Sequence, residues 1–203
     1  MSKKEENQVP AGPPAASTEG VEVVSKEEIE KILKQVDKEA SARKLTGLPH
    51  WIVYVIGVSW SLFQVYTAAF GLFPAQLQRS IHLAYAFVLT YLLFPARSSD
   101  DSNRLSWYNW AIAFFATYVG LYMALNYIRI MEAGGDYSRM DYIAAGCGIL
   151  LTLEAARRVV GLPIVALSVF FLVYAYFGPY FPGFMAHRGY SLERIASHMY
   201  LTT

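Results

Sequence analysis

The chain has 203 residues and a formal net charge of +1, and it is 55% hydrophobic and 15% aromatic but only 16% charged. Soluble domains carry about a quarter charged residues, so this composition excludes an ordinary soluble domain. The near-neutral charge, with aromatic residues gathered in apolar runs, also argues against a nucleic-acid partner. The single cysteine, Cys147, excludes an internal disulfide, and we interpret it as a small helix-packing residue.

The first 46 residues differ from the rest of the chain. Residues 1–24 are rich in Pro, Ala, Gly and charge, which predicts a disordered cytoplasmic tail. Residues 25–46 predict an amphipathic surface helix, because Ser25 and Glu28 form a capping box and apolar residues recur after them at helical spacing. Two interpretations stay open: the helix lies on the membrane or a partner with its lysines near lipid headgroups, or its charged face is simply solvated.

Residues 47–183 predict a membrane domain. Residues 51–78 contain no charged side chain, and residues 105–128 form an uncharged run of 24, about 36 Å as a helix. We therefore predict an all-α integral membrane protein, a bundle of about five transmembrane helices. The expected spans are residues 51–70, 80–96, 105–128, 141–160 and 162–178.

Smaller features qualify this outline. Gly57 and Ser61 offer a small-residue face for close helix packing in the first span. The connection 129–141 contains two adjacent glycines and five charged residues, which predicts a solvent-facing loop or short turn. Residues 184–203 are expected to form a surface helix after the last span.

A charged joint, called here the ionic joint, separates the fourth and fifth spans and consists of Glu154, Arg157 and Arg158. On a helix both guanidinium groups can reach the same carboxylate, because the arginines follow it by three and four residues. Gly161 suits the end of one helix and Pro163 the first turn of the next. We interpret the ionic joint as a paired structural cluster at the membrane interface; a proton relay is the alternative reading.

Three further polar residues fall inside the predicted spans: His82, Gln64 and Asn126. His82 is a candidate haem ligand or proton relay, although no second histidine lies in a span. An interfacial hydrogen bond and a contact to a partner subunit are the other interpretations. Gln64 and Asn126 are typical of interhelical hydrogen bonds. The sequence contains no phosphate-binding loop, metal-ligand spacing or nucleophile paired with a base, so we expect no catalytic, cofactor or metal site.

Lysine and arginine counts near the spans predict the orientation. With the amino terminus in the cytoplasm, nine such residues face the cytoplasm and five face the other side. Five spans then place the carboxyl terminus outside.

Three consecutive stretches carry a resemblance to a known family. They are LTLEAARRVVG at 151–161, LPIVALSVFFLVYAYFGPYFPG at 162–183 and HRGYSLERIASHMYLTT at 187–203. They resemble the amino-terminal part of the fused permeases of TRAP transporters of the TAXI subtype, over about residues 47–203. The resemblance implies a small-subunit-like scaffold domain in a bacterial or archaeal cytoplasmic membrane, supporting ion-gradient-driven uptake of small organic acids.

The resemblance also implies partners. They are a large transport domain, which is absent from this sequence, and an extracytoplasmic solute-binding protein of the TAXI type, beside membrane lipids. The alternative hypothesis is a membrane-anchor or cofactor-binding subunit of a membrane enzyme complex, using His82 or Glu154. The nature of the reading frame beyond Thr203 would separate the two hypotheses.

Overall fold

The computed structural model describes residues 42–71, 73–96 and 105–202, and all regular elements within these residues are helical. The predicted tail 1–24 lies outside the described residues, as does most of the predicted helix 25–46. The long helices are α2 (Leu48–Phe70), α3 (Ala75–Leu93), α4 (Trp107–Leu125), α6 (Arg139–Val159) and α7 (Leu162–Phe177). The short ones are α5 (Tyr127–Glu132), α8 (Leu192–Ala196), two 3-10 turns (Gly178–Tyr180 and Gly183–Met185) and a π-helical turn (Ser197–Leu201).

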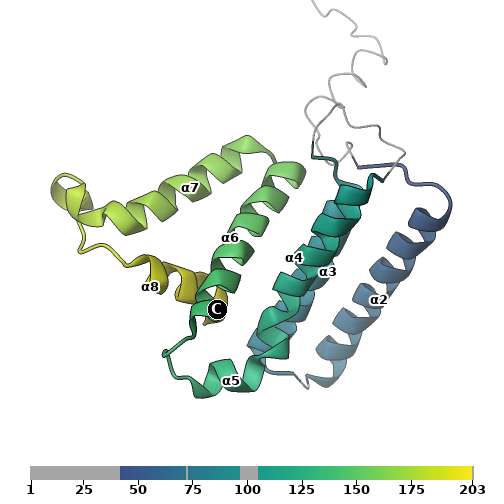
Figure 1. Ribbon diagram of the computed structural model, residues 1–203, viewed down its shortest axis with the longest axis horizontal. Helices are drawn as coiled ribbons and strands as arrows, with labels where there is room; N and C mark the ends of the chain where they lie inside the picture. Colours follow the sequence, from purple (N-terminus) through teal and green to yellow (C-terminus); the bar gives the residue numbers. More distant parts are fainter. Residues whose placement is uncertain (1–41, 72, 97–104, 203) are drawn as a thin grey trace, which may run out of the picture.

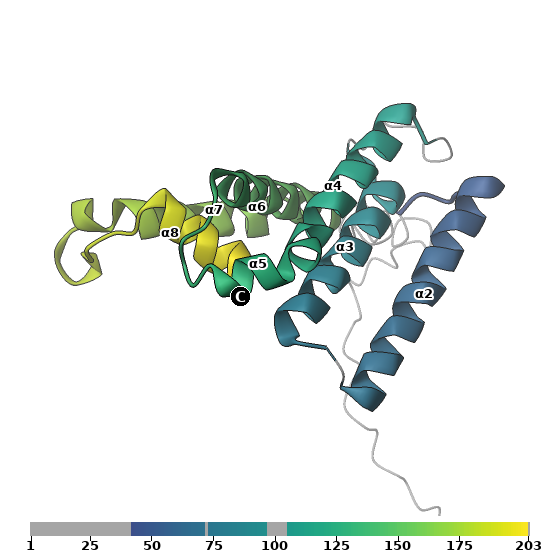
Figure 2. The same cartoon turned by 60° about the horizontal axis from the view of Figure 1, so that its bottom comes forward.

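Helices α2, α3, α4 and α6 run side by side with alternating direction (Figure 1). Helices α3 and α4 form the centre, α2 packs on α3, and α6 lies on the opposite side of the pair from α2, as Figure 2 also shows. Helix α7 leaves the end of α6 at an angle, and the chain then returns through α8 to the other end of α6. We call the two ends of the bundle the α2–α3 end and the α3–α4 end, after the connections that they carry.

The core lies between α3, α4 and α6. Its largest cluster consists of buried side chains from α3 and α4, against which Leu151 and Ala155 of α6 pack: Phe87, Tyr91, Leu92, Ala113 and Ala116. A second cluster at the α2–α3 end joins α4, α5 and α6 to the π-helical turn: Met123, Ile130, Ala145 and Leu201. The carboxyl-terminal end of the described chain is thus part of the packed structure.

Small residues let α3 and α4 approach closely. A Cβ atom added to Gly120 would lie 2.8 Å from the Cα atom of Ala84, closer than real side chains come. The Ser80 hydroxyl bridges the same contact, donating to the carbonyl of Gly120 at 2.6 Å and accepting from the amide of Ala124 at 3.2 Å. Interfaces of this kind are typical of membrane helices, which associate through close packing because the hydrophobic effect does not drive helices together within lipid.

We expect Gly120→Ala to lower the free energy of unfolding by about 2 kcal/mol, because the methyl group must push two backbones apart. Gly57→Ala is the matched control, since no described atom lies within 4 Å of a Cβ at Gly57. The alanine there should be neutral or slightly stabilising, because alanine favours a helix over glycine. Melting temperatures in detergent check both; equal melting of the two variants would mean that α3 and α4 are not in close contact.

Helices α2 and α7 expose apolar side chains on nearly all sides. Thr67 is the one buried residue of α2 and α7 has none, while Trp51, Leu62 and Phe171 are each more than half exposed. A helix that is apolar all round belongs in a protein core or in a membrane. Among the described residues, three helical segments are long and apolar enough to cross a bilayer: Leu48–Phe70, Trp107–Leu125 and Leu162–Tyr180.

The other two predicted spans are helices of 19 residues (α3) and 21 residues (α6), but they carry more polar side chains than these three. Their role as spans therefore stays a prediction. The second predicted span (80–96) begins earlier than expected, at Ala75 directly after Pro74, because Arg79 near a helix end does not stop the helix. The third (105–128) ends early, because Asn126 leaves the helical conformation at φ −110° and ψ 16°.

The connection 129–141 was expected to be a solvent-facing loop or turn, and that prediction is wrong in part. Helix α5 continues to Glu132, Ile130 is 1% exposed and Asp141 is fully buried. The charged residues suggested water, but Asp141 is buried against Arg129, whose side chain remains partly exposed. The exposed Gly134 and Gly135, both with positive φ, do form the expected turn.

Three smaller expectations also fail. Residues 42–46 are not helical, and the buried Arg43 donates its backbone N–H to the carbonyl of Leu93 at 2.8 Å, so the predicted helix 25–46 does not reach its expected end. No described residue packs closely on the predicted small-residue face at Gly57. The expected surface helix in 184–203 is docked at its end, where Leu201 is fully buried.

Candidate functional site

The ionic joint lies at the last turns of α6, at the α3–α4 end of the bundle. Arg157 forms two hydrogen bonds of 2.7 Å with the Glu154 carboxylate, one from Nε and one from Nη2. Arg158 donates from Nε to the same carboxylate at 2.9 Å. Both guanidinium groups thus reach Glu154, as the spacing predicts, and the helix-start role of Pro163 also agrees with its position in the first turn of α7.

The ionic joint also connects α6 to the end of α3. Arg157 donates to the carbonyl of Ala96 at 3.0 Å, and Arg158 donates to that of Phe94 at 3.3 Å. The side chain of Arg158 is only 3% exposed, and its guanidinium lies over the Tyr91 ring, 4.7 Å from the centroid. The Tyr91 hydroxyl in turn donates to the carbonyl of Leu151 at 2.8 Å. The arginines therefore bind the carbonyl of Phe94, which caps α3, and that of Ala96 just beyond the helix.

The structure brings Gln64 and His82 together between α2 and α3. The side-chain amide of Gln64 hydrogen-bonds Nδ1 of His82, and the Trp60 ring packs edge-on against the imidazole with 4.9 Å between centroids. This is the interhelical hydrogen bond expected of Gln64, with His82 as its partner.

Asn126 does not join the other predicted polar residues. It lies at the carboxyl-terminal end of α4, and its side-chain amide donates to the carbonyl of Tyr122, four residues earlier, at 3.0 Å. The expected interhelical bond is therefore replaced by a local one. The predicted residues thus occupy separate places: the ionic joint at one end of the bundle, and the Gln64–His82 pair and Asn126 towards the other.

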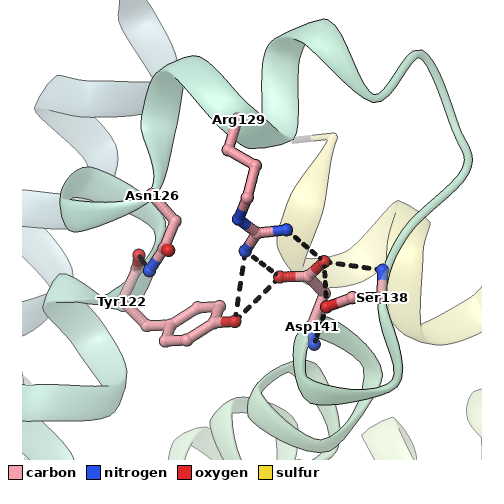
Figure 3. Close-up of polar contacts among 5 residues, drawn as sticks. All are labelled: Tyr122, Asn126, Arg129, Ser138 and Asp141. Atoms are coloured by element: carbon pink, nitrogen blue, oxygen red, sulfur yellow. Dashed lines mark hydrogen bonds and ion pairs between the residues drawn. The ribbon is translucent and has the colours of Figure 1, made fainter.

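Sequence reasoning missed the most extensive polar cluster among the described residues, here called the Asp141 cluster: Tyr122, Arg129, Ser138 and Asp141 (Figure 3). Arg129 binds Asp141 through both terminal nitrogens, at 2.6 Å to Oδ1 and 2.9 Å to Oδ2. The Tyr122 hydroxyl donates to Oδ1 at 2.8 Å. The backbone amide and hydroxyl of Ser138 each donate to Oδ2 at 2.8 Å.

The Asp141 cluster joins three helices. Tyr122 lies on α4 and Arg129 on α5, while Ser138 and Asp141 form the capping box that begins α6. The fully buried carboxylate is compensated by a cation and three neutral donors, which is what a buried charge requires. The carboxylate raises the pKa of Arg129 above its usual value, so the guanidinium stays charged. The cluster fixes how α4, α5 and α6 meet.

One local signal could have revealed part of this cluster. Ser138-Arg-Met-Asp141 has the spacing of a capping box, which announces a helix start and places the aspartate against the backbone. The partnership with Arg129, twelve residues earlier, has no such signal because it depends on the turn between α5 and α6.

The chemistry available to these groups is structural. In the ionic joint and the Asp141 cluster each carboxylate is bound by arginine, and these contacts join helices to one another. Within residues 42–71, 73–96 and 105–202, no group of three His, Cys, Asp or Glu side chains is placed to hold a metal ion.

Comparison with known proteins adds no family. Neither models of protein families, nor curated proteins, nor solved structures gave a match to this chain. Functional inference therefore rests on the residues and on their arrangement.

Proposed function

We propose that this chain is the small-subunit-like scaffold domain of a TRAP transporter permease of the TAXI type. In this role it supports ion-gradient-driven uptake of small organic acids, which an extracytoplasmic binding protein delivers to a large transport domain. Residues 151–203 carry the resemblance on which the proposal depends. The scaffold would lie in a bacterial or archaeal cytoplasmic membrane.

One structural observation supports a scaffold in preference to a solute pathway. The charged groups of the two clusters bind one another and the helix ends, and none of them is left to recognise a solute. At the same time α2 and α7 present broad apolar surfaces. A static domain that enlarges the membrane-embedded part of a transporter needs these two properties, fixed helices and lipid- or protein-facing apolar surfaces.

The proposal includes five spans and a cytoplasmic amino terminus. Topology reporters fused after residues 45, 76, 100, 135 and 186 should then report the cytoplasm at the first and third positions and the opposite side at the second and fourth. The fifth should report the outside. A non-cytoplasmic signal at position 100 would contradict the five-span arrangement, because it would remove α3 from the membrane.

The function is tested by uptake in the source cell. Removing the coding segment for residues 47–183 should abolish binding-protein-dependent uptake of a radiolabelled carboxylate, and restoring it should recover uptake. Purification through a tag on this chain should also retain a partner, or a continuing polypeptide, with ten or more apolar segments. Retention of a redox enzyme subunit in its place would refute the transporter proposal and favour the membrane-anchor alternative.

A further inference from the structure

An open groove of about 570 Å³ lies between α2 and α3 at the α2–α3 end of the bundle. Four polar side chains line it, one from α2 and three from α3, together with Ala75 and Leu83: Gln64, Gln78, Arg79 and His82. It belongs to neither the ionic joint nor the Asp141 cluster. Its position beside the start of α3 puts it where a spanning helix would meet the headgroup layer.

The groove offers positive charge and hydrogen-bond donors. Arg79 is exposed and makes no ion pair or hydrogen bond with another described residue, so its five N–H groups are available. His82 lines the groove beside Arg79, and its Nδ1 hydrogen-bonds the side-chain amide of Gln64. Gln78 donates one amide hydrogen to the Thr67 hydroxyl at 3.1 Å and keeps a second. No carboxylate of the described residues lines the groove.

Such a set of donors favours a phosphate group. Guanidinium matches phosphate oxygens in a two-pronged geometry, and neutral N–H donors can satisfy the remaining oxygens. The surroundings of the groove favour a lipid over a soluble anion, because α2 exposes large apolar side chains outside the groove, such as Leu62, Val65 and Phe70. Acyl chains would cover apolar surface of this helix while the phosphate remains at the end of the helices.

We propose that the α2–α3 groove binds the headgroup of one anionic phospholipid, with Arg79 on the phosphate, Gln78 as an additional donor and His82 in the polar lining beside them. The proposal goes beyond the transporter role and rests on membrane insertion, which it shares with the proposed function. A bound lipid would fill the space between α2 and α3 and fix the position of α2, whose own buried contacts are few.

Native mass spectrometry of the full chain, purified in detergent and incubated with phosphatidylglycerol or phosphatidylcholine, tests the site. We expect one phosphatidylglycerol molecule to remain bound after mild delipidation, and Arg79→Gln to reduce this retention about fivefold. Arg139→Gln is the matched control, because Arg139 is also exposed at this end of the bundle but does not line the groove. Its retention should equal that of the unchanged chain.

A second variant tests the groove without changing charge. Ala75→Phe at the groove wall should also reduce retention, while melting in lipid-free detergent shows whether each variant is folded. Equal retention in Arg79→Gln and Arg139→Gln, equal retention of the two lipids, or displacement by millimolar inorganic phosphate would each overturn the lipid site. Release of the chain from membranes by alkaline carbonate would instead overturn membrane insertion, and with it the transporter scaffold; failure of the lipid site alone leaves that scaffold standing.

Discussion

Asp141→Ala is expected to lower the free energy of unfolding by about 3 kcal/mol, because it removes the centre of the Asp141 cluster. The change leaves Arg129, the Tyr122 hydroxyl and the amide of Ser138 without their shared acceptor. It also removes one half of the capping box that begins α6. For a chain of this size the loss corresponds to roughly 9 °C in melting temperature.

Asp136→Ala is the matched control, because Asp136 lies in the same connection but is exposed and has no described ion pair. It should change the melting temperature by less than about 2 °C. Comparable losses in the two variants would show that the connection, and not the buried carboxylate, sets stability.

A double-mutant cycle separates the ion pair from the rest of the Asp141 cluster. Arg129→Gln leaves a fully buried carboxylate without its cation, whereas Arg129→Gln combined with Asp141→Asn leaves two neutral amides that can hydrogen-bond. We therefore expect the double variant to melt above the temperature that the two single losses predict when added. Additive losses would mean that Arg129 and Asp141 do not interact in the folded protein.

Helix positions could be predicted from the sequence wherever long apolar runs define them. The run after Gly47 and the run from Leu162 correspond to α2 and α7, because both have the length and apolar composition that predict a membrane-crossing helix. The helix ends were less accurate. Charge was used to delimit the spans, whereas Pro74 and Asn126 end or begin helices through backbone geometry that charge does not report.

Some polar contacts could likewise be predicted from the sequence and others could not. The bonds from Arg157 and Arg158 to Glu154 follow from three- and four-residue spacing within one helix, so sequence alone was sufficient for them. The pairing of Gln64 with His82 depends on which faces of α2 and α3 meet. That is decided by packing across both helices, which no local pattern encodes.

The same limit explains the oversight at Asp141. Five charged residues within residues 129–141 suggest water, and composition cannot distinguish a solvated charge from one that is buried with a partner. The arrangement appears only when the turn at Gly134 and Gly135 reverses the chain and brings α5 against the start of α6.

The ionic joint leads to the second large expected effect. Arg157→Ala combined with Arg158→Ala should destabilise the protein more than Glu154→Ala. The double change leaves Glu154 without a cation and removes the donors to the carbonyls of Phe94 and Ala96. We expect it to cost about 3 kcal/mol in free energy of unfolding. Melting temperatures in detergent and in lipid measure the difference.

Glu154→Ala should cost less, because both arginines keep other contacts. Arg157 retains the carbonyl of Ala96, and Arg158 retains that of Phe94 and its position over the Tyr91 ring. The difference in stability between Glu154→Ala and the double arginine variant is reduced by the burial of Arg158. This side chain is only 3% exposed, so when it loses its carboxylate it cannot turn to water or to anionic lipid instead. Arg158→Ala alone should accordingly lower the melting temperature more than Arg157→Ala alone.

Adding Glu154→Gln to the double arginine variant provides the decisive comparison. The neutral amide removes the unpaired carboxylate but cannot replace the donors to the end of α3, so part of the lost stability should return and part should not. Arg139→Ala with Arg188→Ala is the control for net charge, because both residues are exposed and neither has a described ion pair. If the triple and double variants have the same melting temperature, the unpaired carboxylate does not destabilise the protein. The stabilising contribution of the ionic joint would then come from the arginine contacts with α3 alone.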